Sequence, residues 1–122
     1  MRADDHLGVY VQGWTKGAAQ TILRVVTDDY VFDDPNTGQI ARADFGSYMD
    51  DLKKIVASIR GEGYSGPFME ITEATVREDD DGLTAWCWWS IPGTPIQGSG
   101  LIKANNNGVR HERIAYYTKL SV

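Results

Sequence analysis

Apolar residues in the first half of the chain recur every three or four positions, which is the spacing of amphipathic helices. The pattern predicts three helices, over residues 4–15, 18–26 and 43–60. Lys16-Gly17 separates the first two, because glycine suits the left-handed conformation that follows a helix. Between the second and third helices, Tyr30-Val31-Phe32 predicts a short strand.

The second half of the chain changes to an alternating pattern, which is typical of half-buried strands. It predicts four antiparallel strands, over residues 68–77, 83–91, 96–104 and 109–119. Asp81-Gly82 and Asn107-Gly108 are strong hairpin turns, and Pro92-Gly93 ends the second of these strands. The chain is therefore expected to place its helices before most of its strands.

The predicted strand over residues 83–91 carries bulky apolar side chains on both of its faces. Trp86 and Trp88 point one way, while Cys87 and Trp89 point the other. A sheet with water on one side is expected to be polar on that side. One face can pack on the helices, but no predicted helix remains to cover the other. We therefore expect a homodimer through the outer face of the sheet.

Length, charge and residue counts narrow the class of protein. The 122 residues predict one domain, over residues 1–122, and the net charge of −5 disfavours nucleic acid as a partner. The chain shows no signal peptide and no apolar run of membrane-spanning length, so we expect a cytoplasmic protein with no membrane partner. Two histidines, one cysteine and the absence of a phosphate-binding glycine loop predict no metal and no cofactor.

The order of the predicted elements is helix, helix, strand, long helix and four strands. This order resembles the cystatin-like cone of the nuclear transport factor 2 (NTF2) superfamily, over about residues 7–117. The superfamily includes SnoaL-like polyketide cyclases, ketosteroid isomerases and limonene epoxide hydrolase. The resemblance implies an α+β fold in which N-terminal helices pack on a curved, mostly antiparallel sheet and enclose one pocket.

Two local segments are similar to ketosteroid isomerases. Residues 10–17 resemble their first helix, whose tyrosine donates a hydrogen bond to the substrate oxyanion, and residues 28–35 resemble the strand that ends in their catalytic aspartate and a proline. The resemblance thus assigns Tyr10 as oxyanion donor and Asp34 as general base. The second oxyanion donor of these isomerases, a protonated aspartate, aligns with Gly100, so no carboxyl group is expected at that point.

Tyr10 and Asp34 each have a purely structural interpretation as well. Asp34 can cap the backbone N–H groups of the turn that begins at Pro35. Inside an apolar pocket, burial would instead raise its pKa and make it a base. Tyr10 lies on the buried stripe of its helix, where its hydroxyl can bind a backbone carbonyl as well as a ligand. The residues alone leave both interpretations open.

The last predicted strand presents a different set of side chains on each face. One set is His111, Arg113, Ala115 and Tyr117, and the other is Arg110, Glu112, Ile114 and Tyr116. The resemblance puts the first set in the pocket, where Arg113 needs a carboxylate partner and Asp34 is the natural one. A register slip of one residue would place Glu112 there instead. His111 is either a helper in proton transfer or a strand-end residue open to water.

Aromatic residues complete the predicted site. The expected pocket walls, which would bind an apolar, ring-bearing small molecule, are Trp14, Phe32, Tyr48, Trp86, Trp88 and Tyr117. The favoured function is cofactor-free proton transfer, as in an isomerase, cyclase or dehydratase, with Asp34 as base, Tyr10 as donor and Arg113 or His111 as electrostatic helper. The alternatives are a ligand-binding or dimeric interaction module without catalysis, and an epoxide hydrolase-like Asp–Arg site. A pure interaction module predicts no pocket large enough for a ligand.

Overall fold

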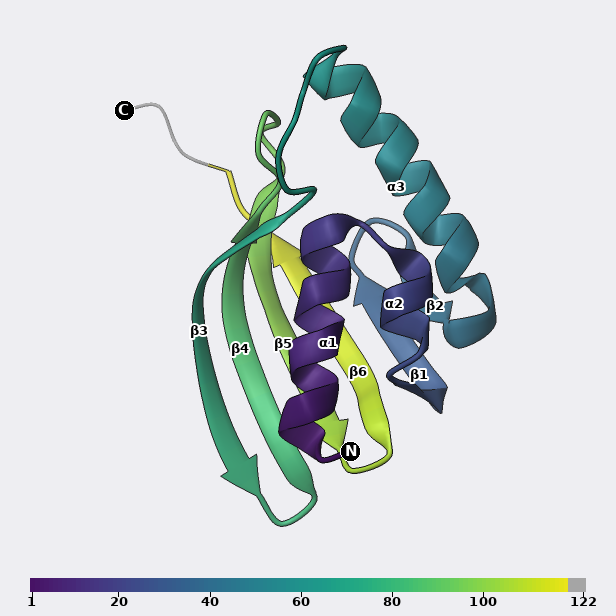
Figure 1. Ribbon diagram of the computed structural model, residues 1–122, viewed down its shortest axis with the longest axis vertical. Coiled ribbons are helices and arrows are strands. Elements are labelled where there is room, and N and C mark those ends of the chain that lie inside the picture. Colours follow the sequence, from purple (N-terminus) through teal and green to yellow (C-terminus); the bar gives the residue numbers. More distant parts are fainter. Residues whose placement is uncertain (119–122) are drawn as a thin grey trace.

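A curved six-stranded sheet forms one layer of the protein, and α1 crosses its inner face in front of β5 and β6 (Figure 1). The computed structural model describes residues 1–118. The helical elements are α1 (Ala3–Lys16), α2 (Ala19–Leu23), the short 3-10 helix η1 (Arg42–Asp44) and α3 (Phe45–Arg60). The strands are β1 (Val26–Asp34), β2 (Gly38–Ala41), β3 (Glu70–Asp79), β4 (Gly82–Ser90), β5 (Gln97–Asn105) and β6 (Gly108–Tyr116).

The strand order across the sheet is β2-β1-β6-β5-β4-β3. All neighbours are antiparallel except β1 and β6, which run parallel. The four predicted strands of the second half are confirmed as the consecutive neighbours β3 to β6. The predicted end of the last strand at Lys119 lies outside the described residues, and β6 ends at Tyr116.

The first helix ends as its sequence predicts. Gly17 follows Lys16 in the left-handed conformation, with φ of 65°, and a side chain at this position would collide with Phe68. Gly13 lets α1 approach α2 closely, because a Cβ at this position would overlap the side chain of Ile22 on α2. Glycines at these two positions therefore let α1 and α2 pack closely and let the chain turn between them.

The region between α2 and α3 differs from the sequence prediction in two ways. The helix predicted over residues 18–26 stops at Leu23, and the strand predicted at residues 30–32 begins already at Val26. The Val109 N–H donates to the Val25 carbonyl at 2.8 Å, so pairing with β6 overrides the local helical spacing. The strand β2 was not predicted, because its residues Gly38–Ala41 are mostly exposed and show no apolar alternation.

Alternation along β4 confirms its two predicted faces. Ala85, Cys87 and Trp89 are buried against the helices, whereas Trp86 is 37% exposed on the outer face. The inner face of the sheet, together with α1 and one side of α3, thus forms the core. On α3 the core extends as far as the buried Val56, whereas Ile55 and Ile59 are exposed.

The inward side of β6 is the opposite of the one that the resemblance implied. Ala104 pairs with Val109 and Lys103 pairs with His111, so Arg110 is an extra residue with no partner across the ladder. This β-bulge shifts every later residue of β6 by one position. Glu112 consequently faces the core with 5% exposure, and Arg113 faces outward. The expectation that Arg113 lies in the pocket is therefore wrong.

Candidate functional site

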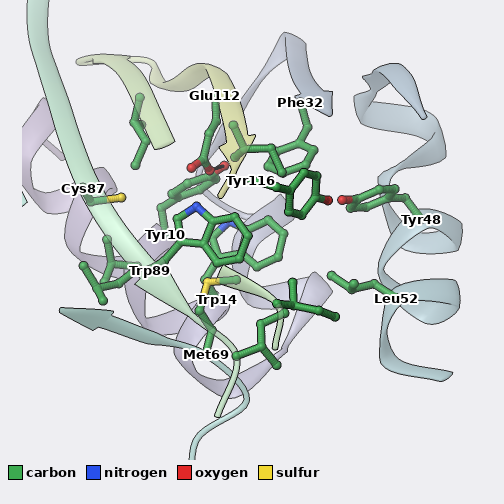
Figure 2. Close-up of a pocket in the computed structure, with 16 residues that line it drawn as sticks. Tyr10, Trp14, Phe32, Tyr48, Leu52, Met69, Cys87, Trp89, Glu112 and Tyr116 are labelled. Atoms are coloured by element: carbon green, nitrogen blue, oxygen red, sulfur yellow. Dashed lines mark hydrogen bonds between the residues drawn. The ribbon is translucent and has the colours of Figure 1, made fainter. Parts of the chain in front are cut away.

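A pocket lies between the inner face of the sheet, α1 and α3 (Figure 2). Its wall is almost entirely apolar and aromatic, and Glu112 is the one charged residue among the described residues that line it. The hollow including its open mouth measures about 480 Å³, but the space that the centre of a water molecule can reach is only about 30 Å³. That space suits roughly two water molecules. A ring-bearing ligand can therefore enter only if side chains of the wall move.

Glu112 and two tyrosines form a buried hydrogen-bonded chain at the inner end of the pocket. The Tyr10 hydroxyl donates to Glu112 Oε1 at 2.5 Å, and the hydroxyls of Tyr10 and Tyr30 are 2.7 Å apart. A tyrosine hydroxyl has one proton, so Tyr30 donates to Tyr10 while Tyr10 donates to Glu112. Tyr10 and Tyr30 come from α1 and β1, and Glu112 comes from β6. Three separate elements are thus joined at one carboxyl group.

Burial dominates the electrostatics of this chain. It raises the pKa of Glu112 from 4.5 to about 7, while the hydrogen bond from Tyr10 acts in the opposite direction. Burial also raises the pKa of Tyr10, and the nearby Glu112 adds to this effect. Tyr10 therefore keeps its proton at neutral pH, whereas Glu112 is close to half protonated. A group poised in this way can both accept and return a proton near neutrality.

The space for the Glu112 carboxyl group is provided by Gly100 on β5. A Cβ built on Gly100 would overlap Glu112 Oε2 and would lie 3.5 Å from the Cys87 sulfur. The sequence comparison with ketosteroid isomerases predicted no carboxyl group at this point, because Gly100 occupies the aligned position. That expectation is wrong, since the neighbouring strand β6 fills the space with Glu112. The signal in the sequence was the alternative register of the last strand, in which Glu112 rather than Arg113 faces the pocket.

Asp34 is buried at the end of β1, but it does not line the pocket. Its Oδ1 accepts the Asn36 N–H at 2.9 Å, and its Oδ2 accepts the hydroxyls of Tyr48 at 2.7 Å and Tyr116 at 2.8 Å. Figure 2 shows the latter two hydroxyls turned toward one another at the α3 side of the pocket. Asp34 thus caps its turn and also ties α3 to the end of β6. The two carboxylate oxygens of Asp34 together accept these three hydrogen bonds.

The predicted partner of Asp34 lies elsewhere. Arg113 is mostly exposed on the outer face of the sheet, where its Nε lies 3.4 Å from Asp33 Oδ2. An Asp34–Arg113 pair is therefore absent, and with it the basis for an epoxide hydrolase-like site. His111 also faces outward beside Arg113. Burial, followed by the charge of Arg113, lowers the pKa of His111, so this histidine is neutral at pH 7.

The aromatic residues expected in the pocket divide into two groups. Trp14, Phe32 and Tyr48 line it as predicted, together with Tyr10. Trp86, Trp88 and Tyr117 do not, because they lie on the outer face of the sheet. The pocket residues that sequence reasoning did not assign to it include Trp89, Tyr116 and Glu112. Strand alternation separates Trp89 from Trp86 and Trp88, but it does not tell which of the two faces points inward.

Residues 1–118 contain no group of three or more histidine, cysteine, aspartate or glutamate side chains arranged to hold a metal ion. Within the same residues, no helix is both long enough and apolar enough to cross a membrane.

Comparisons with known proteins identify the fold. No family model and no curated protein matches the sequence. Among solved structures, an NTF2-like protein from Anabaena variabilis ATCC 29413 is 14% identical with a TM-score of 0.64, and the match covers 96% of this chain and 87% of that one. A protein from Xanthomonas campestris pv. campestris, provisionally named a polyketide cyclase, is 14% identical with a TM-score of 0.64, covering 94% and 90%.

A third solved structure, provisionally named a ketosteroid isomerase and coming from Kribbella flavida DSM 17836, is 12% identical with a TM-score of 0.59 and covers 97% of this chain and 79% of that one. At such low identity the likeness concerns the fold alone. The protein therefore has the cystatin-like α+β fold of the NTF2-like proteins, as the order of its elements predicted.

Proposed function

We propose that the pocket binds a small, largely apolar carbonyl compound and that Glu112 moves a proton on it without a cofactor. The observation that carries this proposal is a single carboxyl group, with its pKa raised to about 7, in an otherwise apolar wall. Such a group is a stronger base than an exposed carboxylate and is still half ionised at neutral pH. The provisional names of two fold neighbours, polyketide cyclase and ketosteroid isomerase, are compatible with this chemistry.

Glu112 rather than Asp34 is the base in this proposal. The oxygens of Asp34 already accept three hydrogen bonds, and Asp34 lies behind Tyr48 and Tyr116 rather than on the pocket surface. In the proposed step the Glu112 carboxylate takes a proton from the carbon beside the carbonyl, and the C–H electron pair forms the enolate. When the substrate carries a carbon–carbon double bond β,γ to the carbonyl, the enolate is conjugated, and Glu112 returns the proton to its γ carbon. The double bond thereby moves into conjugation with the carbonyl.

Entry of the substrate requires the mouth of the pocket to widen. Tyr48, Leu52 and Tyr116 are its partly exposed residues at that side. The shared contacts of Tyr48 and Tyr116 with Asp34 hold α3 against the end of β6. We propose that these two hydrogen bonds open when a ligand enters. Asp34 thereby becomes a residue that controls access rather than one that reacts.

The test is the isomerisation of cyclohex-3-en-1-one to its conjugated isomer, followed by ultraviolet absorbance. Glu112→Gln should lose turnover of this ketone. Asp34→Asn, the matched change at the other buried carboxyl group, should retain it. The rate of the unaltered protein should rise with pH with a midpoint near 7, because the ionised form of Glu112 is the base. Turnover that survives in Glu112→Gln and disappears in Asp34→Asn would reverse the assignment. Ketone binding without turnover would favour the non-catalytic binding module.

We further propose that the outer face of the sheet forms a homodimer. Trp86, Leu101 and Tyr117 are each at least 37% exposed there, and Trp88 packs edge-on against both Trp86 and Tyr117. A contiguous aromatic patch of this kind is typical of an interface. Leu101→Asp should dissociate the dimer in analytical ultracentrifugation, while Ile55→Asp, at a more exposed apolar position on α3, should not. A monomeric unaltered protein at all concentrations would contradict the proposal.

A further inference from the structure

Before a ligand enters, the hydroxyl groups around the pocket already use their protons. The proton of Tyr10 goes to Glu112, and those of Tyr48 and Tyr116 go to Asp34. A carbonyl compound that loses a proton develops negative charge on its oxygen, and this charge needs hydrogen-bond donors. Tyr10, to which the resemblance assigned that task, is already committed to Glu112. Donors that are free before the ligand arrives must therefore come from other groups on the pocket wall.

Two indole N–H groups on that wall have no hydrogen-bond partner. The Nε1 atoms of Trp14 and Trp89 are buried and unpaired within residues 1–118, and the two side chains are only 5% and 4% exposed. Both tryptophans line the pocket, and in Figure 2 both indole nitrogens project toward its middle. A buried donor without an acceptor destabilises the fold, so such groups are rare. Nearby ring faces, those of Phe45 and Tyr116, are only weak acceptors.

Both indoles are held in place by packing rather than by hydrogen bonds. Trp14 contacts Phe32 and Phe45 with ring centroids 5.3 Å and 5.7 Å apart. Trp89 lies against Gly98, where a Cβ would come within 2.7 Å of its ring, and it meets Tyr116 edge-on at 5.8 Å. Gly98 thus gives the Trp89 ring room. Rigid donors that are oriented before the ligand arrives are what stabilisation of a developing charge requires.

We propose that the indole N–H groups of Trp14 and Trp89 are the donors that hold the carbonyl oxygen of the ligand in this pocket. The ligand class follows from this arrangement: a small cyclic ketone or a compound with an equivalent acceptor oxygen on an apolar ring. The proposal rests on the proposed function for its catalytic meaning, since the same two donors would stabilise the enolate oxygen while Glu112 holds the proton. Ketone binding by the two indoles can be measured without any turnover.

The experiment uses the full chain labelled with ¹⁵N and two probes of nearly the same shape, cyclohexanone and methylenecyclohexane. Only the first has an acceptor oxygen. The indole N–H signals of Trp14 and Trp89 should move downfield and saturate with cyclohexanone but not with methylenecyclohexane. The signals of Trp86 and Trp88, on the outer face of the sheet, should not move and serve as internal controls.

Trp14→Phe and Trp89→Phe give a second readout. Each should reduce the ratio of cyclohexanone affinity to methylenecyclohexane affinity about five- to tenfold, the effect of one neutral hydrogen bond. The ratio corrects for the packing that each substitution also removes. If a variant does not fold, the spectra of the unaltered protein still decide the matter.

The outcomes separate this proposal from the proposed function. Unmoved indole signals at saturating ketone, no ketone-dependent signal at all, or equal affinity for both probes would overturn the role of the two tryptophans, even if Glu112-dependent isomerisation is observed. Indole signals that move as expected, without isomerisation, would uphold the acceptor site and remove the catalytic function.

Discussion

Replacement of Glu112 by glutamine should change how the stability of the protein depends on pH. The pKa of Glu112 is about 7 in the folded protein, against 4.5 for an ordinary glutamate. Between these two values the folded state holds a proton that the unfolded state has released. The contribution of the protonated group to stability is therefore fully present below about 4.5, and it is lost as the pH rises through 7. At about 1.4 kcal/mol for each pH unit between the two pKa values, the full loss is about 3 kcal/mol.

Urea unfolding of the unaltered protein and of Glu112→Gln at about pH 5 and about pH 8 measures this effect. The substituted glutamine side chain keeps the shape of the glutamate and does not titrate. Other groups titrate equally in both proteins, so their effects cancel in the difference between the two free energies of unfolding. From the lower to the higher pH this difference in free energy should move by about 2–3 kcal/mol in favour of the variant.

Glu73→Gln is the matched control, because Glu73 is exposed on β3 and its substitution should leave the pH dependence unchanged. Parallel pH profiles for the unaltered protein and Glu112→Gln would refute the reasoning. They would mean that the carboxyl group does not carry its raised pKa in the folded state, and the proposed base would then have no special basicity.

Three further predictions concern the surroundings of this carboxyl group. Tyr10→Phe should raise the pKa of Glu112 above 7 in a carbon-13 NMR titration, since the hydrogen bond from Tyr10 lowers it, and an unchanged pKa would mean that another group supplies that bond. Gly100→Ala should destabilise the fold by about 1–3 kcal/mol because its Cβ would overlap Glu112, whereas Gly8→Ala, with open space around it, should be neutral or stabilising by about 0.5–1 kcal/mol in thermal melts. Cys87 should react very slowly with thiol reagents at neutral pH, because burial and the nearby Glu112 raise the pKa of its thiol to about 12; fast modification in the folded state would contradict this.

Much of the fold could be predicted from local patterns. The helical spacing before Gly17, the turn that follows Asp34 and the hairpin turns at Asp81-Gly82 and Asn107-Gly108 are all encoded by neighbouring residues. Helix α1 and the strands β3 to β6 appeared where these patterns indicated. The errors fell on residues 24–26 and 38–41, where pairing with a distant or adjacent strand decided the conformation.

The site was harder to predict, because it depends on which side of each strand faces the pocket. Alternation placed Phe32 and Asp34 on one side of β1, and both are buried. For β6 alternation grouped Glu112 with Ile114, but the resemblance put the other set in the pocket; the unpaired residue Arg110 decides which set faces inward. The expected Asp34–Arg113 pair therefore gave way to a Glu112–Tyr10 pair.

The sequence by itself determined most of the elements and their order, and it placed Tyr10 on the buried stripe of the first helix, because each of these follows from residues close together in the chain. Only the tertiary structure decided that Glu112 is the pocket carboxyl group, that Gly100 leaves room for it and that two tryptophan N–H groups remain without acceptors among residues 1–118. The physical reason is that these facts arise from contacts between α1, β4, β5 and β6. The bulge at Arg110 and the lack of a side chain at Gly100 set the geometry of those contacts, and no local pattern specifies either effect.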